Sequence, residues 1–297
     1  MTNPVANGRF ALANSHQDFA ELSALEADLL GAVGGQELLE EKLRSFFRSA
    51  IDEVIDTARS RRHSFEQLEK TEKTYLGTKF EILLRDWLQV PTGVRMDLLV
   101  GGREVDVKST TSGGSAWMIP PEAIDQLCIL LRVDEASSKC AFGLIFIRRE
   151  YLNLGRNRDA KGTISAASRK NIWWVVSDFA YTPNFWTIIS EHDRLEIMAC
   201  NGGTKRVAML FERYQKISVS RVQIIAIAQQ DDPMRRIRRN GGARDLLAPK
   251  GIAILYSEND RDLMNSLGLK FGSREFMSYK AVNELERIKL REAKLID

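Results

Sequence analysis

Two aspartates and a lysine interrupt an otherwise apolar hairpin at residues 96–108, whose sequence is MDLLVGGREVDVK. Side chains alternate across a strand, so Asp106 and Lys108 are predicted to share one face. Asp97 is predicted to lie opposite Asp106, and like charges in that position are destabilising. A divalent cation would remove the repulsion, because hard cations take carboxylate oxygens as ligands. The pattern therefore predicts a metal site on one side of the hairpin.

The turn of this hairpin sets the pairing of its strands. The glycine pair at 101–102 is typical of a two-residue type I′ turn, because both central positions of that turn need positive φ. Val100 then pairs with Arg103, and counting back along both strands places Asp97 directly opposite Asp106. The Cβ atoms of directly opposed residues lie about 4.5–5.5 Å apart, so the two carboxylates should meet.

A helix is predicted upstream of the hairpin, from about Tyr75 to Leu88, and Glu81 lies at the edge of its apolar stripe rather than on the watery face. An acid two residues before a lysine is weak evidence alone, because this chain contains four such pairs. Only the pair at 106–108 lies on a predicted strand, faces another aspartate and follows a helix with an acid at its apolar margin. The candidate catalytic residues are therefore Glu81, Asp97, Asp106 and Lys108.

These residue types suit metal-dependent hydrolysis of a phosphodiester. Mg²⁺ is usually held by one or two carboxylates together with substrate phosphate, so Asp97 and Asp106 are its expected ligands. Glu81, the third predicted metal-binding residue, is expected to reach in from the helix to a second ion or a metal-bound water. Such an ion lowers the pKa of its water and neutralises charge on the scissile phosphate. Lys108, on the same face, would orient the attacking water and stabilise the oxyanion.

The composition excludes several classes of protein. At 297 residues, with 44% hydrophobic and 28% charged residues, the chain has the length and mixture of one large or two ordinary globular domains. Its longest apolar runs, such as GLIFI and IWWVV, are too short to span a bilayer, so no membrane partner is expected. The N-terminus lacks a signal-peptide pattern. Three scattered cysteines without a CxxC motif favour a reducing cytoplasm over a disulfide framework or a zinc site.

The net charge of +3 conceals two strongly basic segments. Residues 148–170 carry a local charge of +5, and residues 235–250 carry another +5. A single segment of this kind could be an ordinary solvated face. Two of them, each with interleaved Gly and Asn, favour a polyanionic partner such as nucleic acid.

Two groups of side chains in these segments are the candidate DNA contacts. Arginine and asparagine can read guanine and adenine edges through paired hydrogen bonds in the major groove. Adjacent arginines fan around a helix, so the second segment is expected to contact phosphates rather than bases. The base-reading group, in a polar loop, is Arg156, Asn157, Arg158 and Lys161, and the phosphate-binding group is Arg235, Arg236, Arg238 and Arg239.

The order of predicted elements indicates a mixed α/β fold in two domains. Helical patterns at residues 19–60 and 75–88 precede the hairpin and the strands QLCILLRV, AFGLIFIRR and IWWVV, which predicts a domain with a central sheet at 1–180. In the second domain, 181–297, the helices KRVAMLFERY and SRVQIIAIAQQ precede an arginine-rich helix that opens at Pro233. The strands GIAILYS and REFMSYK follow, which is typical of a winged helix-turn-helix module.

The helix and hairpin together resemble the PD-(D/E)xK nuclease superfamily, with Met96 where a proline usually stands. Several segments are similar, more closely, to the NaeI-type type II restriction endonucleases, and the resemblance covers about residues 65–275. The segments that carry it are TEKTYLGTKFE, DLLVGGREVDVK, GGSAWMIPPEA, LNLGRNRDAKGTISAASR and AQQDDPMRRIRRNGGARDLLAPKGIAIL.

The resemblance implies that the four candidate catalytic residues form a metal-binding nuclease site that cleaves both strands of a short palindromic duplex. It also implies an N-terminal PD-(D/E)xK endonuclease domain and a C-terminal CAP-like winged-helix domain that binds a second double-stranded DNA copy as effector. A homodimer and a cognate DNA methyltransferase of the same system are the other expected partners. Two alternatives stay open: an inert DNA-binding regulator, and a repair nuclease that nicks a single strand.

Overall fold

The computed structural model describes residues 8–111, 116–154 and 160–297. Packing divides the chain into two units: the first extends to Ala50 and resumes at Glu69–Tyr181, and the second holds Ile51–Leu68 and Thr182–Asp297. The chain thus leaves the first unit one residue after the predicted boundary at 180. The sequence predicts Ile51–Leu68 in the first domain, but this segment packs with the second unit. A continuous helical pattern does not show which of two cores its buried face joins.

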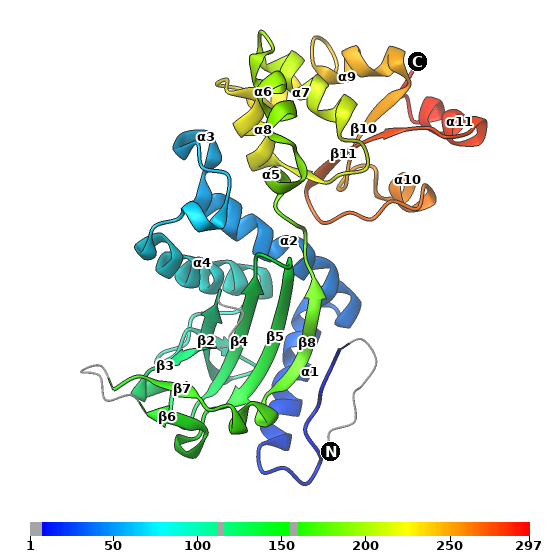
Figure 1. Cartoon of the computed structure of the whole chain (residues 1–297). Coiled ribbons are helices and arrows are strands. Elements are labelled where there is room, and N and C mark those ends of the chain that lie inside the picture. The colour runs from blue at the N-terminus through cyan, green and yellow to red at the C-terminus, as the bar shows by residue number, and fades with distance from the viewer. Residues whose placement is uncertain (1–7, 112–115, 155–159) are drawn as a thin grey trace. The chain divides into compact units, whose positions relative to one another are not determined.

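A five-stranded mixed sheet forms the centre of the first unit (Figure 1). Its order is β1-β2-β4-β5-β8, in which β2 and β4 are parallel and the other neighbours are antiparallel. β4 and β5 are almost fully buried, as their continuous apolar runs predict. The expected mixed α/β architecture is confirmed. The strands are β1 (Leu98–Val100), β2 (Arg103–Thr110), β4 (Leu127–Asp134), β5 (Lys139–Phe146) and β8 (Trp173–Ala180).

Helices α1 (Phe19–Val33) and α2 (Gln36–Ile55) correspond to the helical patterns predicted near the N-terminus. α1 ends where Gly34 adopts a φ of 86°, a left-handed conformation that glycine takes without steric cost. The buried face of α1 packs on the sheet at β1 and β5. Among the described residues, no helix has both the length and the apolar character that a bilayer span requires.

Helix α4 (Lys70–Leu88) carries Glu81 and packs against β2 and α1. It begins five residues before the predicted start at Tyr75, because Glu69 and Glu72 form a capping box around its first turn. Glu81 is half-buried beside the apolar stripe, as predicted. The fully buried members of that stripe are Leu76, Phe80, Leu84 and Leu88.

A second, three-stranded sheet in the first unit has the order β3-β7-β6. It consists of β3 (Met118–Ile119), β7 (Gly162–Ile164) and β6 (Leu152–Leu154). The sequence predicts only a polar connection around β6 and β7, because strands of three residues are too short to show an alternating pattern. Trp117, next to β3, is fully buried, and its indole N–H donates to a carbonyl of β4. It is therefore a core residue.

The second unit contains short helices and a three-stranded antiparallel sheet of order β10-β11-β9. Its predicted helices and strands are confirmed as α7, α8, β10 and β11, whose apolar side chains form much of the core. The helices are α3 (Thr57–Ser60), α5 (Phe185–Ile188), α6 (Glu191–Ala199), α7 (Gly203–Arg213), α8 (Arg221–Ala228), α9 (Ala243–Leu247), α10 (Arg261–Ser266) and α11 (Glu284–Glu292), and the strands are β9 (Val219–Ser220), β10 (Ile252–Tyr256) and β11 (Glu275–Lys280).

The arginine-rich helix predicted from Pro233 is much shorter than expected. Pro233–Arg236 form a single 3-10 turn, in which the Asp232 side chain accepts the N–H of the third residue. Like charges three and four residues apart repel on a helix surface, and Arg238 and Arg239 would meet that repulsion. Asn240 then takes a left-handed φ of 65° and ends any helical path. The helix prediction is therefore wrong beyond its first turn.

Candidate active site

The β1–β2 hairpin forms in the predicted register, and its two turn glycines have φ values of 54° and 78°. The ladder stops at Leu98, one residue before Asp97 would join it. β1 therefore leaves the edge of β2 unpaired beside Asp106. The Asp97 side chain fills this place, because its Oδ2 accepts the backbone N–H of Val107 at 2.8 Å. A side-chain bond thus replaces the expected backbone pairing of the two aspartates.

Asp106 and Lys108 point to the same face of β2 and form an ion pair. Lys108 Nζ lies 2.6 Å from Asp106 Oδ1 and 3.8 Å from Asp97 Oδ2. The Asp106 side chain is only 7% exposed, whereas Asp97 keeps 31% of its surface open. The cluster therefore has a sheltered floor and an open side, which a substrate could approach.

Glu81 joins this cluster from α4. Burial raises its pKa from 4.5 to about 7, and repulsion by Asp97 adds to the rise while Lys108 opposes it. The helix approaches β2 closely at Gly77, one turn before Glu81, where an added Cβ would lie 3.2 Å from Ser109 Oγ. The structure thus brings all four predicted catalytic residues to one edge of the sheet.

The environment of Asp106 disfavours its charge. Burial and, after it, the hydrogen-bonding contact with the Asp97 carboxyl raise its pKa, Lys108 opposes the rise, and the net result is a shift from 3.8 to about 6. Cys128, its partner across the parallel β2–β4 ladder, is fully buried and offers no charge to compensate. Burial would lower the pKa of Lys108, yet attraction to Asp106 leaves that pKa above its ordinary value. The lysine therefore stays charged, while Glu81 takes up a proton near pH 7 and Asp106 near pH 6.

The donor set fits a divalent cation. Asp106 Oδ2 is buried and has no hydrogen-bond donor among the described residues. A buried acceptor without a donor costs about 1–3 kcal/mol, so a positive partner at this point would be favoured. Three carboxylates face a single ammonium, and carboxylate oxygens are the ligands that Mg²⁺ prefers. Asp97 and Asp106 could hold such an ion, with Lys108 beside them. Among the described residues, the ligand atoms of Glu81, Asp97 and Asp106 do not all lie within 4.8 Å of one another, so Glu81 would act on water bound to the ion rather than on the same ion directly.

The predicted DNA-contact residues occupy other parts of the chain. Arg156, Asn157 and Arg158 lie outside the described residues. Lys161 is exposed immediately before β7, in the same unit as the four predicted catalytic residues. In the second unit the arginine group forms the 3-10 turn and the segment after it. Arg235, Arg238 and Arg239 are exposed there, and Arg236 is half-buried.

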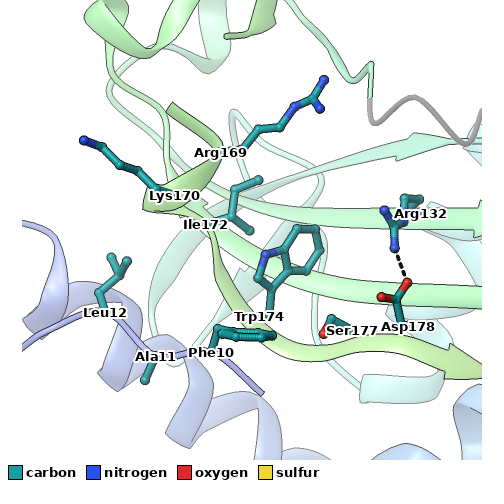
Figure 2. A pocket seen from close by; sticks show the side chains of 10 residues that line it. All are labelled: Phe10, Ala11, Leu12, Arg132, Arg169, Lys170, Ile172, Trp174, Ser177 and Asp178. Carbon is teal, nitrogen blue, oxygen red and sulfur yellow. Dashed lines mark hydrogen bonds and ion pairs between the residues drawn. The ribbon is translucent and has the colours of Figure 1, made fainter. Parts of the chain in front are cut away.

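A cavity of about 290 Å³ lies beside β8 in the first unit (Figure 2). Phe10 and Trp174 line its apolar wall, and Arg132 is held there by an ion pair with Asp178 at 2.9 Å. None of the four predicted catalytic residues lines this cavity. The cluster of predicted catalytic residues is therefore separate from this cavity.

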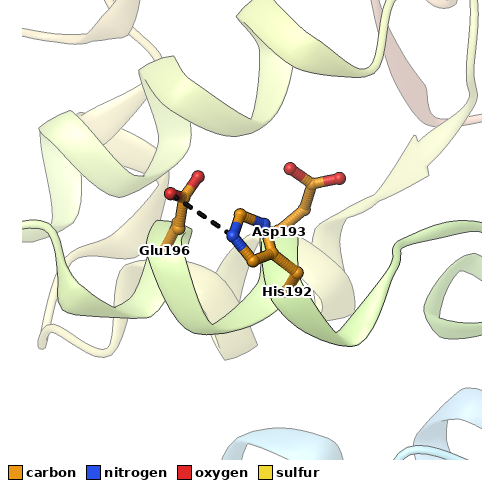
Figure 3. A group of neighbouring side chains, drawn as sticks. All are labelled: His192, Asp193 and Glu196. Atoms are coloured by element: carbon orange, nitrogen blue, oxygen red, sulfur yellow. Dashed lines mark ion pairs between the residues drawn. The ribbon is translucent and has the colours of Figure 1, made fainter.

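A further polar cluster lies on α6 in the second unit (Figure 3). Ligand atoms of His192, Asp193 and Glu196 lie within 4.8 Å of one another, the one such trio in the part of the chain that the structure describes. Arg213 forms ion pairs with both acids, and the Tyr214 hydroxyl donates to Asp193 at 2.6 Å. A guanidinium already pairs with both carboxylates, so this trio is part of an exposed salt-bridge network.

Glu104 escaped the prediction from sequence, although alternation places it on the same face of β2 as Asp106 and Lys108. Its carboxylate accepts the backbone N–H groups of three consecutive residues, 94–96. That segment immediately precedes Asp97. The sequence did contain a signal for Glu104, because charged residues alternate along REVDVK at residues 103–108. The predicted site used only Asp106 and Lys108 from this stretch.

The mixed sheet with acidic side chains along one edge is consistent with a nuclease fold. A family model described as "Restriction endonuclease NaeI" matches residues 39–287, which include most of both units. The type II restriction enzyme NaeI of Lentzea aerocolonigenes is 34% identical over 237 residues, covering 77% of this chain and 74% of that enzyme. The chain therefore belongs to the NaeI restriction endonuclease family. It is a type II restriction endonuclease, a site-specific deoxyribonuclease.

Proposed function

We propose that this enzyme uses Mg²⁺ to hydrolyse both strands of a short palindromic DNA site. The observation that carries the proposal is the convergence of three carboxylates and a lysine on the open edge of β2. The buried Asp106 oxygen without a donor supports a cation at this point. The proposed active-site residues are Glu81, Asp97, Asp106 and Lys108.

Each member of the cluster has a separate chemical task. Bound Mg²⁺ would acidify water and offset the negative charge of the scissile phosphate. Lys108, fixed by Asp106 at 2.6 Å, keeps its ammonium charged and can donate hydrogen bonds to phosphate oxygens as their charge grows. Glu81, with a pKa of about 7, can accept a proton from water near neutral pH. Asp97 and Asp106 contribute the oxygens that hold the ion.

The second unit is proposed to be a winged-helix domain that binds a second copy of the DNA. The order α7, β9, α8, α9 and the β10–β11 ribbon suits a helix-turn-helix with a β wing. The basic segment 235–250 lies between α8 and β10, where such a module places its recognition helix. Burial lowers the pKa of Arg244. The negative charge of Asp260 raises this pKa, whereas the positive charge of Arg239 lowers it. A phosphate would relieve this crowding of positive charge.

The same proposal includes the recognition of DNA bases and the assembly of two chains into a dimer. Arg156, Asn157, Arg158 and Lys161 are proposed to read base edges in the major groove. Each chain supplies one set of catalytic residues, whereas a double-strand break needs two. A symmetric homodimer presents the same set twice and matches a palindromic site. A cognate DNA methyltransferase would protect the host's own copies of that site.

The direct test is incubation of the purified chain with plasmid DNA and Mg²⁺, followed by sequencing of the ends. We expect double-strand breaks at one short palindrome, and no cleavage with a chelator present. Sedimentation should show a particle of twice the chain mass of 33.7 kDa. Intact plasmid in Mg²⁺, or nicks at unrelated sequences, would contradict the proposal.

The affinity for divalent cations should fall steeply as the pH falls. Binding requires ionised carboxylates, and the pKa values of Glu81 and Asp106 are raised to about 7 and about 6. The dissociation constant should therefore rise by up to about tenfold for each pH unit below 7, and more steeply below 6. Calorimetry with Ca²⁺ in buffers of different ionisation enthalpy measures the protons released.

The stability of the cation-free protein supplies an independent check on this coupling. Both acids have raised pKa values in the folded state, so the folded state binds their protons more tightly than the unfolded chain. Their ionisation therefore costs stability, and the cost grows as pH rises from about 4 through the folded-state values. A divalent cation should raise the melting temperature more at pH 8 than at pH 5. An equal rise at both would contradict the coupling.

A further inference from the structure

The segment that leads into Asp97 is bound to β2 through one side chain. The Glu104 carboxylate accepts the N–H groups of Val94, Arg95 and Met96 at 2.8, 3.2 and 2.9 Å. The bond from Met96 is the largest of the effects that lower the pKa of Glu104, so this carboxylate is charged at neutral pH. Three consecutive backbone donors around one ionised carboxylate form charge-assisted bonds, which are stronger than neutral ones.

The chain closes around this carboxylate at Gly93. A Cβ added there would lie 2.3 Å from Glu104 Oε2 and 2.6 Å from the carbonyl oxygen of Met96. Real Cβ atoms do not approach so closely, and the second of these neighbours is backbone. Glycine at this position therefore permits the segment to wrap around the side chain of Glu104.

The same segment is tied to β2 at a second point. Asp97 Oδ2 accepts the N–H of Val107, three residues along the strand from Glu104. The segment 94–97 is therefore bound to β2 at both ends. The Glu104 carboxylate accepts the N–H groups of residues 94–96, and the Val107 N–H donates to the Asp97 side chain. Between them these contacts determine where the Asp97 carboxylate meets Asp106 and Lys108.

We propose that Glu104 is a positioning residue that sets the place of the Asp97 carboxylate, and thereby the affinity of the site for its divalent cation. The inference rests on the proposed role of Asp97. Glu104 is not itself a candidate ligand, because its two oxygens already accept three backbone N–H groups. Its effect passes through the 94–97 segment.

The surroundings of Glu104 indicate that its loss would loosen this segment without unfolding the protein. The β1–β2 and β2–β4 ladders are formed by backbone bonds that do not involve its side chain. Val94 and Arg95 are exposed, so water can bond the N–H groups that Glu104 releases there, whereas Met96 is buried. A purely structural residue would instead affect the melting temperature and leave cation affinity unchanged.

Glu104→Gln is the principal test, because it keeps the shape and removes the charge. The dissociation constant for Ca²⁺, measured by calorimetry, and the half-saturating Mg²⁺ concentration for cleavage should each rise about tenfold. High Mg²⁺ should restore most of the rate. Amide hydrogen exchange at residues 94–97 should accelerate, while the melting temperature changes by no more than about 2 °C. Glu122→Gln, an exposed acid of the same unit, is the matched control.

Two further variants separate the possible failures. Gly93→Ala keeps Glu104 and displaces it, so it should reproduce the loss of cation affinity. Asp97→Asn should abolish cleavage if the proposed active site is right, and normal cleavage by it would overturn that assignment instead. If Asp97→Asn is inactive while Glu104→Gln binds Ca²⁺ and exchanges amides as the wild type does, the positioning role of Glu104 is wrong. A large fall in melting temperature with unchanged cation affinity would also overturn it.

Discussion

Asp106→Asn should lower the rate of plasmid cleavage by at least about a thousandfold, equivalent to about 4 kcal/mol in the activation barrier. Asp106 anchors Lys108 at 2.6 Å and presents the buried oxygen that has no donor among the described residues. The amide removes the charge that attracts a cation and weakens the hold on the ammonium. Lys108→Ala should cause a loss of similar size, because no other described ammonium lies in the cluster.

DNA binding provides the readout that separates catalysis from folding. In Ca²⁺, both variants should bind duplex DNA within about threefold of the wild type, because phosphate contacts dominate affinity and are expected elsewhere in the chain. Asp106→Asn should melt no lower than the wild type, since its carboxyl is costly to ionise in the folded state. Asp86→Asn, an exposed acid on α4, is the control. Linearisation of plasmid near the wild-type rate by either variant would remove Asp106 and Lys108 from the active site.

The hairpin shows what sequence can predict at short range. Its register follows from two adjacent glycines and the alternation of side chains, both of which are properties of neighbouring residues. The structure confirms that register and brings Asp106 and Lys108 together. The premature end of the ladder at Leu98 was not predictable in the same way. At that point Glu104 binds the backbone before Asp97, which is a contact across the hairpin rather than a pattern along it.

Contacts between distant segments account for the other differences. Cys128 lies beside Asp106 only because β2 and β4 pair in parallel through a long connection. The segment 51–68 continues a helical pattern, yet it joins the second unit, where Asp52 accepts a hydrogen bond from Gln223 at 3.1 Å. Local periodicity shows that a helix has a buried face and leaves open which partner covers it.

The basic segment of the second unit illustrates a limit of propensity. Arginine favours helices and Pro233 suits a helix start, so the sequence predicts a continuous helix. Only one 3-10 turn forms, because repulsion between arginines three and four residues apart disfavours a longer helix. The exposed Arg235, Arg238 and Arg239 are nevertheless available to a polyanion. Helical propensity was therefore a poor guide to the local structure of this segment.

A short duplex that carries the recognition sequence should accelerate cleavage of a plasmid with one site, by about 5–150-fold if the two DNA sites are coupled by about 1–3 kcal/mol. The expectation follows from the basic segment, which belongs to the second unit, whereas the proposed active-site residues belong to the first. Replacing Arg235, Arg236, Arg238 and Arg239 by alanine should abolish the acceleration. The dependence of effector binding on salt should also flatten, by up to about 0.9 in log–log slope for each phosphate that the variant no longer binds.

A charge-matched pair of variants distinguishes specific contacts from a general change in net charge. The double variant Arg238→Ala with Arg239→Ala removes two exposed arginines of the basic segment. The double variant Arg287→Ala with Arg291→Ala removes two from α11, where both pair with Glu284. Only the first pair should weaken activation, because the second lies outside the basic segment. Equal rates on one-site and two-site plasmids, unaffected by added duplex, would show that the second unit binds the same DNA that the first unit cuts.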